Sequence, residues 1–275
     1  MSSWRTQTIL IIASFKEGNE VTEDSGSMSF LQHLEELRSR LIRAVIAIIT
    51  GFVICIAFGE RVFSILAAPI TKLLPKDSTL VFTSLQDPFF VYLKVAFIAG
   101  IFLALPYVLY QLWLFIYPGL LETERRLSVP FIVTATLLFY LGAAFAYFVV
   151  FPAAFQFFLG YQTAELKPMI SIKDYVSLVI MLMLAFGVVF ETPIVIVFLG
   201  LLGLFDSSFL KRGRRYFVVL AFIIAAVLTP TPDVINQTLM AIPMLLFYEI
   251  GIQVLVLFEK KRRREEEMKA SEDQE

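Results

Sequence analysis

The sequence predicts an all-α integral membrane protein with six transmembrane helices. Hydrophobic residues make up 58% of its 275 residues and charged residues 17%, with a mean hydropathy of +0.79, whereas soluble domains have about 45–50% and about 25%. The apolar residues gather in runs that approach the ~20 residues a helix needs to cross a ~30 Å hydrocarbon core. The predicted spans are residues 42–58, 89–117, 129–151, 175–205, 216–228 and 235–258.

The predicted membrane domain covers residues 28–258. Residues 1–27 are mostly polar, and their one apolar patch is too short to span, so they are expected to form a disordered N-terminal extension. The segment HLEELRSRL (33–41) has apolar residues at helical spacing and leads directly into the first span. Residues 259–275 form a charged run that predicts a solvated cytoplasmic tail.

Two regions between the spans have features of their own. In residues 59–87 a helical apolar period is interrupted by Pro69 and ends at Pro75, which predicts a short helix along the membrane interface. The second span should kink at Pro106. Four amphipathic aromatic residues near its end are expected at the interface: Tyr107, Tyr110, Trp113 and Tyr117.

The last two predicted helices are short. Residues 206–215 form a basic loop, and the 13 residues that follow would make only about 20 Å of helix. The turn TPTPD leads into the last span, which contains Pro243. Such a short span implies local thinning of the bilayer or a buried turn.

Lysine and arginine predict that both termini are cytoplasmic. They concentrate before span one, after spans two and four, and behind span six, whereas the turn between spans five and six has none. Short loops rich in these residues stay in the cytoplasm. The residues that set the orientation are Arg38, Arg40, Arg43, Arg125, Arg126, Lys211, Arg212, Arg214, Arg215 and 260–264.

Glu191 is the one ionisable residue in the fourth span and lies near its midpoint. A carboxyl group at that depth costs at least ~2.5 kcal/mol on insertion scales, so it should face protein or a wet cavity. Pro193 frees a backbone carbonyl about one turn earlier, which concentrates polarity at this level. A protonated glutamic acid that joins two helices is the structural interpretation, and a functional site is favoured over it.

The sequence gives no sign of an enzyme. It has no GxxxxGK[ST] loop, GxSxG or HExxH motif. The single Cys55 excludes an intramolecular disulfide, and the only histidine, His33, has no cysteine or second histidine to share a metal. We therefore expect no metal and no cofactor.

Two further carboxylates lie at the cytoplasmic membrane surface, where the positive-inside rule accounts only for lysine and arginine. Glu36 can pair with Arg40 one turn on, and Glu124 can favour the N-terminus of the third span through the helix dipole. The functional alternative is that both receive a guanidinium-bearing ligand through paired, charge-assisted hydrogen bonds.

Several blocks of the sequence resemble the TatC family, the multi-spanning receptor subunit of the twin-arginine protein translocase. They include HLEELRSRL (33–41), APITKLLP (68–75), YQLWLFIYPGL (110–120), ERRLSVPF (124–131), AFGVVFETPI (185–194) and TPDVINQTLMAIPM (231–244). The resemblance implies a concave, glove-like fold in the bacterial cytoplasmic (inner) membrane. It also implies binding of twin-arginine signal peptides, partnership with TatB, TatA and other TatC copies, and export of folded proteins driven by the proton gradient.

The resemblance also implies roles for individual residues. Glu36 and Glu124 would meet the twin arginines, Glu191 would contact polar groups of partner helices, and Phe115 and Pro69 match positions that matter in the family. The remaining matched positions are Arg38 and Arg125 beside the signal peptide and Asp233 and Gln237 at the docking edge for TatB and TatA. The chain departs from the pattern in its N-terminal extension and in TPTPD, where TPPD is common. The alternative function is a proton-coupled secondary transporter or channel that uses Glu191.

Overall fold

The computed structural model describes residues 30–74, 79–117, 128–160, 169–228 and 234–272. These residues form helices and short connections with no β-strand, apart from one isolated parallel bridge between Val81 and Ser171. The chain divides into two compact units, Met1–Ser39 and Arg40–Glu275. The described part of the first unit consists of the opening turns of helix α2 (Phe30–Ile56). The predicted extension 1–27 lies outside the described residues.

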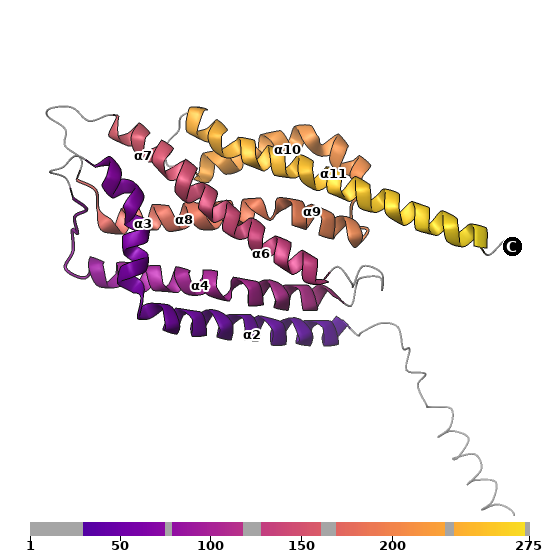
Figure 1. Cartoon of the computed structure of the whole chain (residues 1–275), viewed down its shortest axis with the longest axis horizontal. Coiled ribbons are helices and arrows are strands. Elements are labelled where there is room, and N and C mark those ends of the chain that lie inside the picture. The colour runs from indigo at the N-terminus through magenta and orange to yellow at the C-terminus, as the bar shows by residue number, and fades with distance from the viewer. Residues whose placement is uncertain (1–29, 75–78, 118–127, 161–168, 229–233, 273–275) are drawn as a thin grey trace, which may run out of the picture. The chain divides into compact units, whose positions relative to one another are not determined.

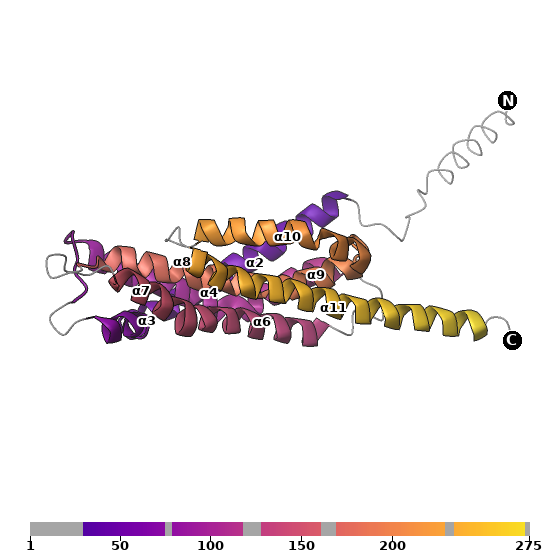
Figure 2. The same ribbon diagram turned by 90° about the horizontal axis from the view of Figure 1, so that it is seen from above.

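The second unit is a bundle of helices. Its elements beyond α2 are α3 (Gly59–Leu73), α4 (Asp87–Ile116), α6 (Ser128–Phe145), the π-helix η2 (Ala146–Val150), α7 (Phe151–Leu159), α8 (Ile172–Phe190), α9 (Thr192–Leu201), α10 (Ser207–Leu228) and α11 (Val234–Glu272). Figures 1 and 2 show α10 lying beside α11, and Figure 1 shows α3 crossing one end of the other helices. Buried apolar residues of α3, α4, η2, α7, α8, α10 and α11 form the main core, with Val95, Val179 and Leu182 almost inaccessible to solvent.

Five stretches of the described residues are long and apolar enough to cross a membrane: Gln32–Ile56, Asp87–Ile116, Ser128–Leu159, Ile172–Leu201 and Gln237–Arg264. They correspond to the first, second, third, fourth and sixth predicted spans. The fifth predicted span lies in α10, whose apolar part is too short to qualify, as its length in the sequence had indicated. The chain is therefore a multi-pass membrane protein.

Helix α10 begins earlier than the sequence predicted. Residues 207–215, expected in a basic loop, are its first turns. Asp206 caps this end by accepting a hydrogen bond from the Phe209 amide at 3.0 Å. Glu259 of α11 accepts two more, from the amide (2.7 Å) and hydroxyl (2.5 Å) of Ser207. The first four amides of a helix have no partner within the helix and favour negative charge. The two carboxylates therefore stabilise a helix start that the basic side chains had suggested was a loop.

Helix α11 is longer than predicted. It runs for 39 residues through the apolar segment and on through the charged run to Glu272. That run consists largely of Glu, Lys and Arg, which are strong helix formers. Because Glu259 holds the start of α10, packing against the membrane domain extends at least one residue into the predicted tail.

Helix α3 continues through Pro69, where the sequence had suggested an interruption. A proline has no amide hydrogen, so it leaves the carbonyl four residues earlier without its helical partner. That carbonyl belongs to Ile65, and it accepts a hydrogen bond from the Tyr147 hydroxyl at 2.6 Å. The Tyr175 hydroxyl donates to the next carbonyl, that of Leu66, also at 2.6 Å. Two tyrosines thus attach α3 to η2 and α8.

In the second span, too, a tyrosine hydroxyl donates to a carbonyl that a proline leaves free. Pro106 lies inside α4 and leaves the Phe102 carbonyl without its helical donor. The Tyr140 hydroxyl of α6 donates to that carbonyl at 2.7 Å. In a medium without water such groups must find partners within the protein, and hydroxyls of neighbouring helices supply them.

Candidate functional site

Glu36 and Arg38 lie in the first turns of α2, within the first unit. The Glu36 side chain is half-buried and that of Arg38 is exposed. Two residues are about 200° apart around a helix, so the two side chains leave α2 on different sides. Arg38 is therefore not the helical neighbour that would neutralise the Glu36 carboxylate. Their predicted partners Glu124 and Arg125 lie outside the described residues.

Phe115 and Pro69 both belong to the second unit. Phe115 is half-buried near the C-terminal end of α4. Pro69 is half-buried inside α3, where it creates the free Ile65 carbonyl that binds Tyr147. Pro69 therefore has a structural role, because it allows α3 to be attached to η2 through Tyr147, in addition to the role implied by the resemblance.

Glu191 stands at a break in the fourth span. Helix α8 ends at Phe190 and α9 begins at Thr192, because Pro193 cannot supply an amide to the carbonyl of Val189. The Thr192 hydroxyl donates to that carbonyl instead, at 2.6 Å. The predicted concentration of polar groups at this level is therefore present, and the backbone part of it is satisfied within the span.

The Glu191 side chain lines a cavity of about 130 Å³ between α4, α6 and α9. Trp113, on α4, lines the same cavity and is only 2% exposed. Glu191 Oε1 and Trp113 Nε1 are both buried and have no hydrogen-bond partner among the described residues. A buried polar atom without a partner costs about 1–3 kcal/mol, so the cavity holds two groups prepared for a polar guest.

The two groups are complementary in chemistry. The indole nitrogen is a donor only, and the glutamate oxygen is an acceptor when ionised. The walls around them are aromatic and aliphatic, with Phe131 and Phe198 beside the indole ring. A guest that both accepts and donates, such as a hydroxyl, a carboxamide or water, can satisfy both groups at once.

An apolar groove of about 420 Å³ adjoins this cavity. It lies between α6, α9 and α11, and Phe131 and Ile194 line both spaces. Pro193, in the first turn of α9, is part of the groove wall. An apolar helix lying against this surface would bring its own polar groups close to Glu191.

Gln237 uses its side chain within the chain. Its amide nitrogen donates to the Phe222 carbonyl at 3.0 Å, which ties the start of α11 to α10. Arg214 of α10 and Glu249 of α11 make a second link, an ion pair at 2.5 Å. Asp233, the other residue predicted at this docking edge, lies outside the described residues.

Sequence reasoning missed Trp113. Its neighbours in the sequence suggested an interfacial aromatic, and Tyr107, Tyr110 and Tyr117 are indeed exposed, but Trp113 is buried among three helices. Its spacing gave no signal of burial: Trp113 follows Tyr110 by three residues and precedes Tyr117 by four, which places it beside both of these exposed tyrosines on the helix. That spacing does not by itself tell which face meets the protein.

Comparison with known proteins identifies the family. The family model described as Sec-independent protein translocase protein (TatC) matches residues 32–243. Two relatives described as "Sec-independent protein translocase protein TatC" are each 43% identical, from Desulforapulum autotrophicum over 238 residues (86% of this chain, 88% of the relative) and from Escherichia coli strain K12 over 237 residues (86% and 92%).

A solved structure agrees with these matches. The crystal structure of a twin arginine translocase receptor, TatC, is 44% identical in sequence and superposes with a TM-score of 0.72, covering 82% of this chain and 98% of that one. An identity of this size over most of both chains confirms the six-helix architecture predicted from the sequence. The chain belongs to the TatC family.

Proposed function

We propose that this chain is the receptor subunit of a twin-arginine translocase in the bacterial cytoplasmic membrane. In this role it binds the signal peptides of folded precursors at the cytoplasmic face and assembles with TatB and TatA for export driven by the proton gradient. Membership of the TatC family is the observation that carries the proposal. The chain carries out no catalysis in this process and uses no cofactor.

Signal recognition rests on carboxylates at the membrane surface. Glu36 and Glu124 receive the two guanidinium groups, because arginine binds a carboxylate through two parallel charge-assisted hydrogen bonds. Arg38, two residues after Glu36, and Arg125, directly after Glu124, lie beside the bound signal peptide. Phe115, half-buried at the end of α4, provides apolar contact for the peptide.

Assembly rests on the intramembrane cavity. A single-span partner lies along the apolar groove of α6, α9 and α11 and places a polar side chain between Glu191 and Trp113. The two unpartnered atoms support this assignment, because a guest that bonds to both recovers the cost of their burial. Gln237 and Asp233 add polar groups at the turn between α10 and α11.

Site-specific photo-crosslinking to a twin-arginine peptide tests recognition. Probes beside Glu36 and Glu124 should label the peptide, and Arg→Lys exchange in the peptide should abolish labelling because lysine lacks the bidentate fork. Glu36→Gln should raise the peptide Kd roughly 10- to 100-fold, the loss of one charged hydrogen-bonded pair. Glu35→Gln is the matched control, because it removes the same charge from a different face of α2.

Two outcomes would contradict the proposal. Unchanged peptide affinity in both Glu36→Gln and Glu124→Gln would exclude the paired carboxylates. Proton or solute flux by the purified chain alone in vesicles, abolished by Glu191→Gln, would favour the proton-coupled transporter instead.

A further inference from the structure

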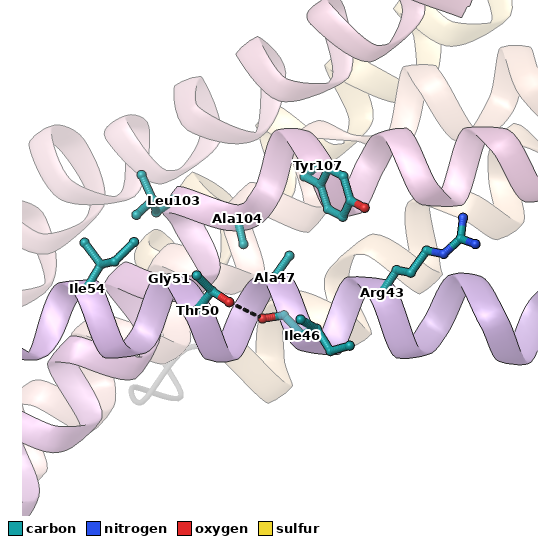
Figure 3. A pocket seen from close by; sticks show the side chains of 9 residues that line it. All are labelled: Arg43, Ile46, Ala47, Thr50, Gly51, Ile54, Leu103, Ala104 and Tyr107. Carbon is teal, nitrogen blue, oxygen red and sulfur yellow. Dashed lines mark hydrogen bonds between the residues drawn. The ribbon is translucent and has the colours of Figure 1, made fainter.

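A second concave surface lies between α2 and α4, away from the Glu191 cavity. Its volume is about 380 Å³, and both helices contribute side chains to it within the second unit. Figure 3 shows these side chains along the line where the two helices meet. We call this surface the α2–α4 groove; it is lined by Arg43, Ile46, Ala47, Thr50, Gly51, Ile54, Leu103, Ala104 and Tyr107.

The floor of the groove is made by close backbone contact. A Cβ atom at Gly51 would lie 2.6 Å from the carbonyl oxygen of Gly100, so only glycine lets the two helices approach this far. The small side chains of Ala47 and Ala104 keep the space above the contact open. The hydroxyl of Thr50 donates back to its own helix, and the surface it adds to the groove is therefore mainly apolar.

One end of the groove is polar and positively charged. Arg43 and Tyr107 both line that end, and Figure 3 shows them on facing helices. Arg43 is exposed and has no hydrogen bond or ion pair among the described residues. Arg40 lies one turn before Arg43 on α2, and Gln111 lies one turn after Tyr107 on α4. The Arg40 guanidinium donates to the Gln111 side chain at 3.4 Å, which adds a second positive charge at this level. None of the residues that line the groove is acidic.

The groove has the length of one leaflet. From Arg43 to Ile54 is eleven residues, or about 16 Å of helix, and half of a hydrocarbon core is about 15 Å. The groove also opens outward: in the span Gln32–Ile56, which lies within α2, only 11% of an 18-residue apolar stretch is buried, and Ile54 is 50% exposed. A straight apolar chain attached to an anionic group matches this shape and this distribution of charge.

We infer that the α2–α4 groove binds one anionic phospholipid. The phosphate accepts hydrogen bonds from the Arg43 guanidinium and the Tyr107 hydroxyl, and one acyl chain lies over Gly51 to Ile54. A positive side chain at the edge of the hydrocarbon is costly, and a bound phosphate offsets that cost. A whole helix is about 10 Å wide and has no counterpart to Arg43 unless it carries an acid, so a lipid fits the groove better than a partner helix.

Native mass spectrometry of the full chain with added phosphatidylglycerol tests this inference, with phosphatidylcholine as the uncharged comparison. The wild-type chain should retain phosphatidylglycerol in preference to phosphatidylcholine. Arg43→Gln should weaken that retention about fivefold, the worth of one positive charge at a membrane surface. Ala47→Phe should abolish it by filling the groove. Arg61→Gln is the matched control, because it removes an exposed positive charge from α3, and it should not change the retention of phosphatidylglycerol.

Four results would overturn the inference. Equal retention by wild type, Arg43→Gln and Ala47→Phe would show that the lipid binds elsewhere. Equal retention of both lipids would exclude phosphate recognition by Arg43. Competition by free glycerophosphoglycerol as strong as that by the intact lipid would show an anion site without an acyl subsite. A change in oligomeric mass in Ala47→Phe, with lipid retention intact, would assign the groove to a second copy of the chain.

Discussion

Two regions of the bundle place polar atoms among apolar side chains, and they do so in opposite ways. Where α3 meets η2 and α8, the hydroxyls of Tyr147 and Tyr175 each find a backbone carbonyl at 2.6 Å. In the cavity between α4, α6 and α9, Trp113 and Glu191 each keep a buried atom without a partner among the described residues. The first region joins three elements by hydrogen bonds, whereas the second holds the two unpartnered atoms on which the proposed assembly site rests.

The presence or absence of a hydrogen-bond partner distinguishes polar groups that stabilise the fold from polar groups that can bind another molecule. A hydroxyl that satisfies a proline-freed carbonyl removes a cost that the helix would otherwise bear. An unpartnered donor and acceptor in one cavity retain their cost until something binds. Natural proteins accept such a cost mainly where activity requires it.

The largest expected effect comes from breaking the paired region. Tyr147→Phe should lower the free energy of unfolding by about 1–3 kcal/mol, because it leaves the proline-freed Ile65 carbonyl without a donor. Tyr175→Phe should lower it by about 0.5–1.5 kcal/mol, because it removes a buried hydrogen bond to the Leu66 carbonyl. Thermal unfolding of the purified chain in lipid nanodiscs measures the change. Tyr110→Phe, which changes an exposed tyrosine, is the control. If the two core variants are as stable as the control, the paired region does not hold α3 in place.

Thr192→Val should have a smaller effect. It removes the hydroxyl that satisfies the Val189 carbonyl beside Pro193 and keeps the branched shape. We expect a loss of about 0.5–1.5 kcal/mol, the worth of one net hydrogen bond. Thr136→Val, whose hydroxyl bonds to a carbonyl that is not freed by proline, provides the comparison in the same unfolding assay. An identical loss in both variants would mean that the proline adds nothing.

The unpartnered region should respond with the opposite sign. Trp113→Phe and Glu191→Leu remove the buried atoms without partners, so the isolated chain should keep its stability or gain up to about 1 kcal/mol. Export of a twin-arginine substrate by whole cells should fall sharply in both variants. A strong loss of stability together with the loss of export would instead make the cavity a structural element that the guest does not need.

The smallest effect concerns the cap of α10, outside the spans. The Ser208 hydroxyl and the Phe209 amide donate to Asp206 and lower the pKa of that carboxyl below its ordinary value of 3.8. A lowered folded-state pKa contributes stability above the unfolded pKa, and this contribution is lost as pH falls through the folded value. Unfolding midpoints measured between pH 6 and pH 3 should show this loss, and Asp206→Asn should remove this part of the pH dependence.

Sequence patterns were sufficient wherever the cause is local. Apolar runs located the spans, and Pro193 located the irregularity at which α8 ends and α9 begins, because a missing amide acts on a carbonyl only four residues away. The helical period of residues 59–74 located α3 for the same reason.

Patterns failed where the partner is distant in the chain. Tyr147 and Ile65 are 82 residues apart, and Ser207 and Glu259 are 52 apart, so no window of sequence contains both members of either pair. Without Glu259 in view, the basic start of α10 resembled a loop. Trp113 resembled an interfacial aromatic for the same reason, because its burial depends on three helices that meet around it.

The sequence by itself determined that the chain is helical, that it spans the membrane several times and that a carboxyl group lies at mid-depth, because hydrophobicity and backbone chemistry act over a few residues. Only the tertiary structure decided which polar groups are paired and which are left open. Pairing depends on the distance between atoms of different helices, and that distance is set by packing across the whole bundle.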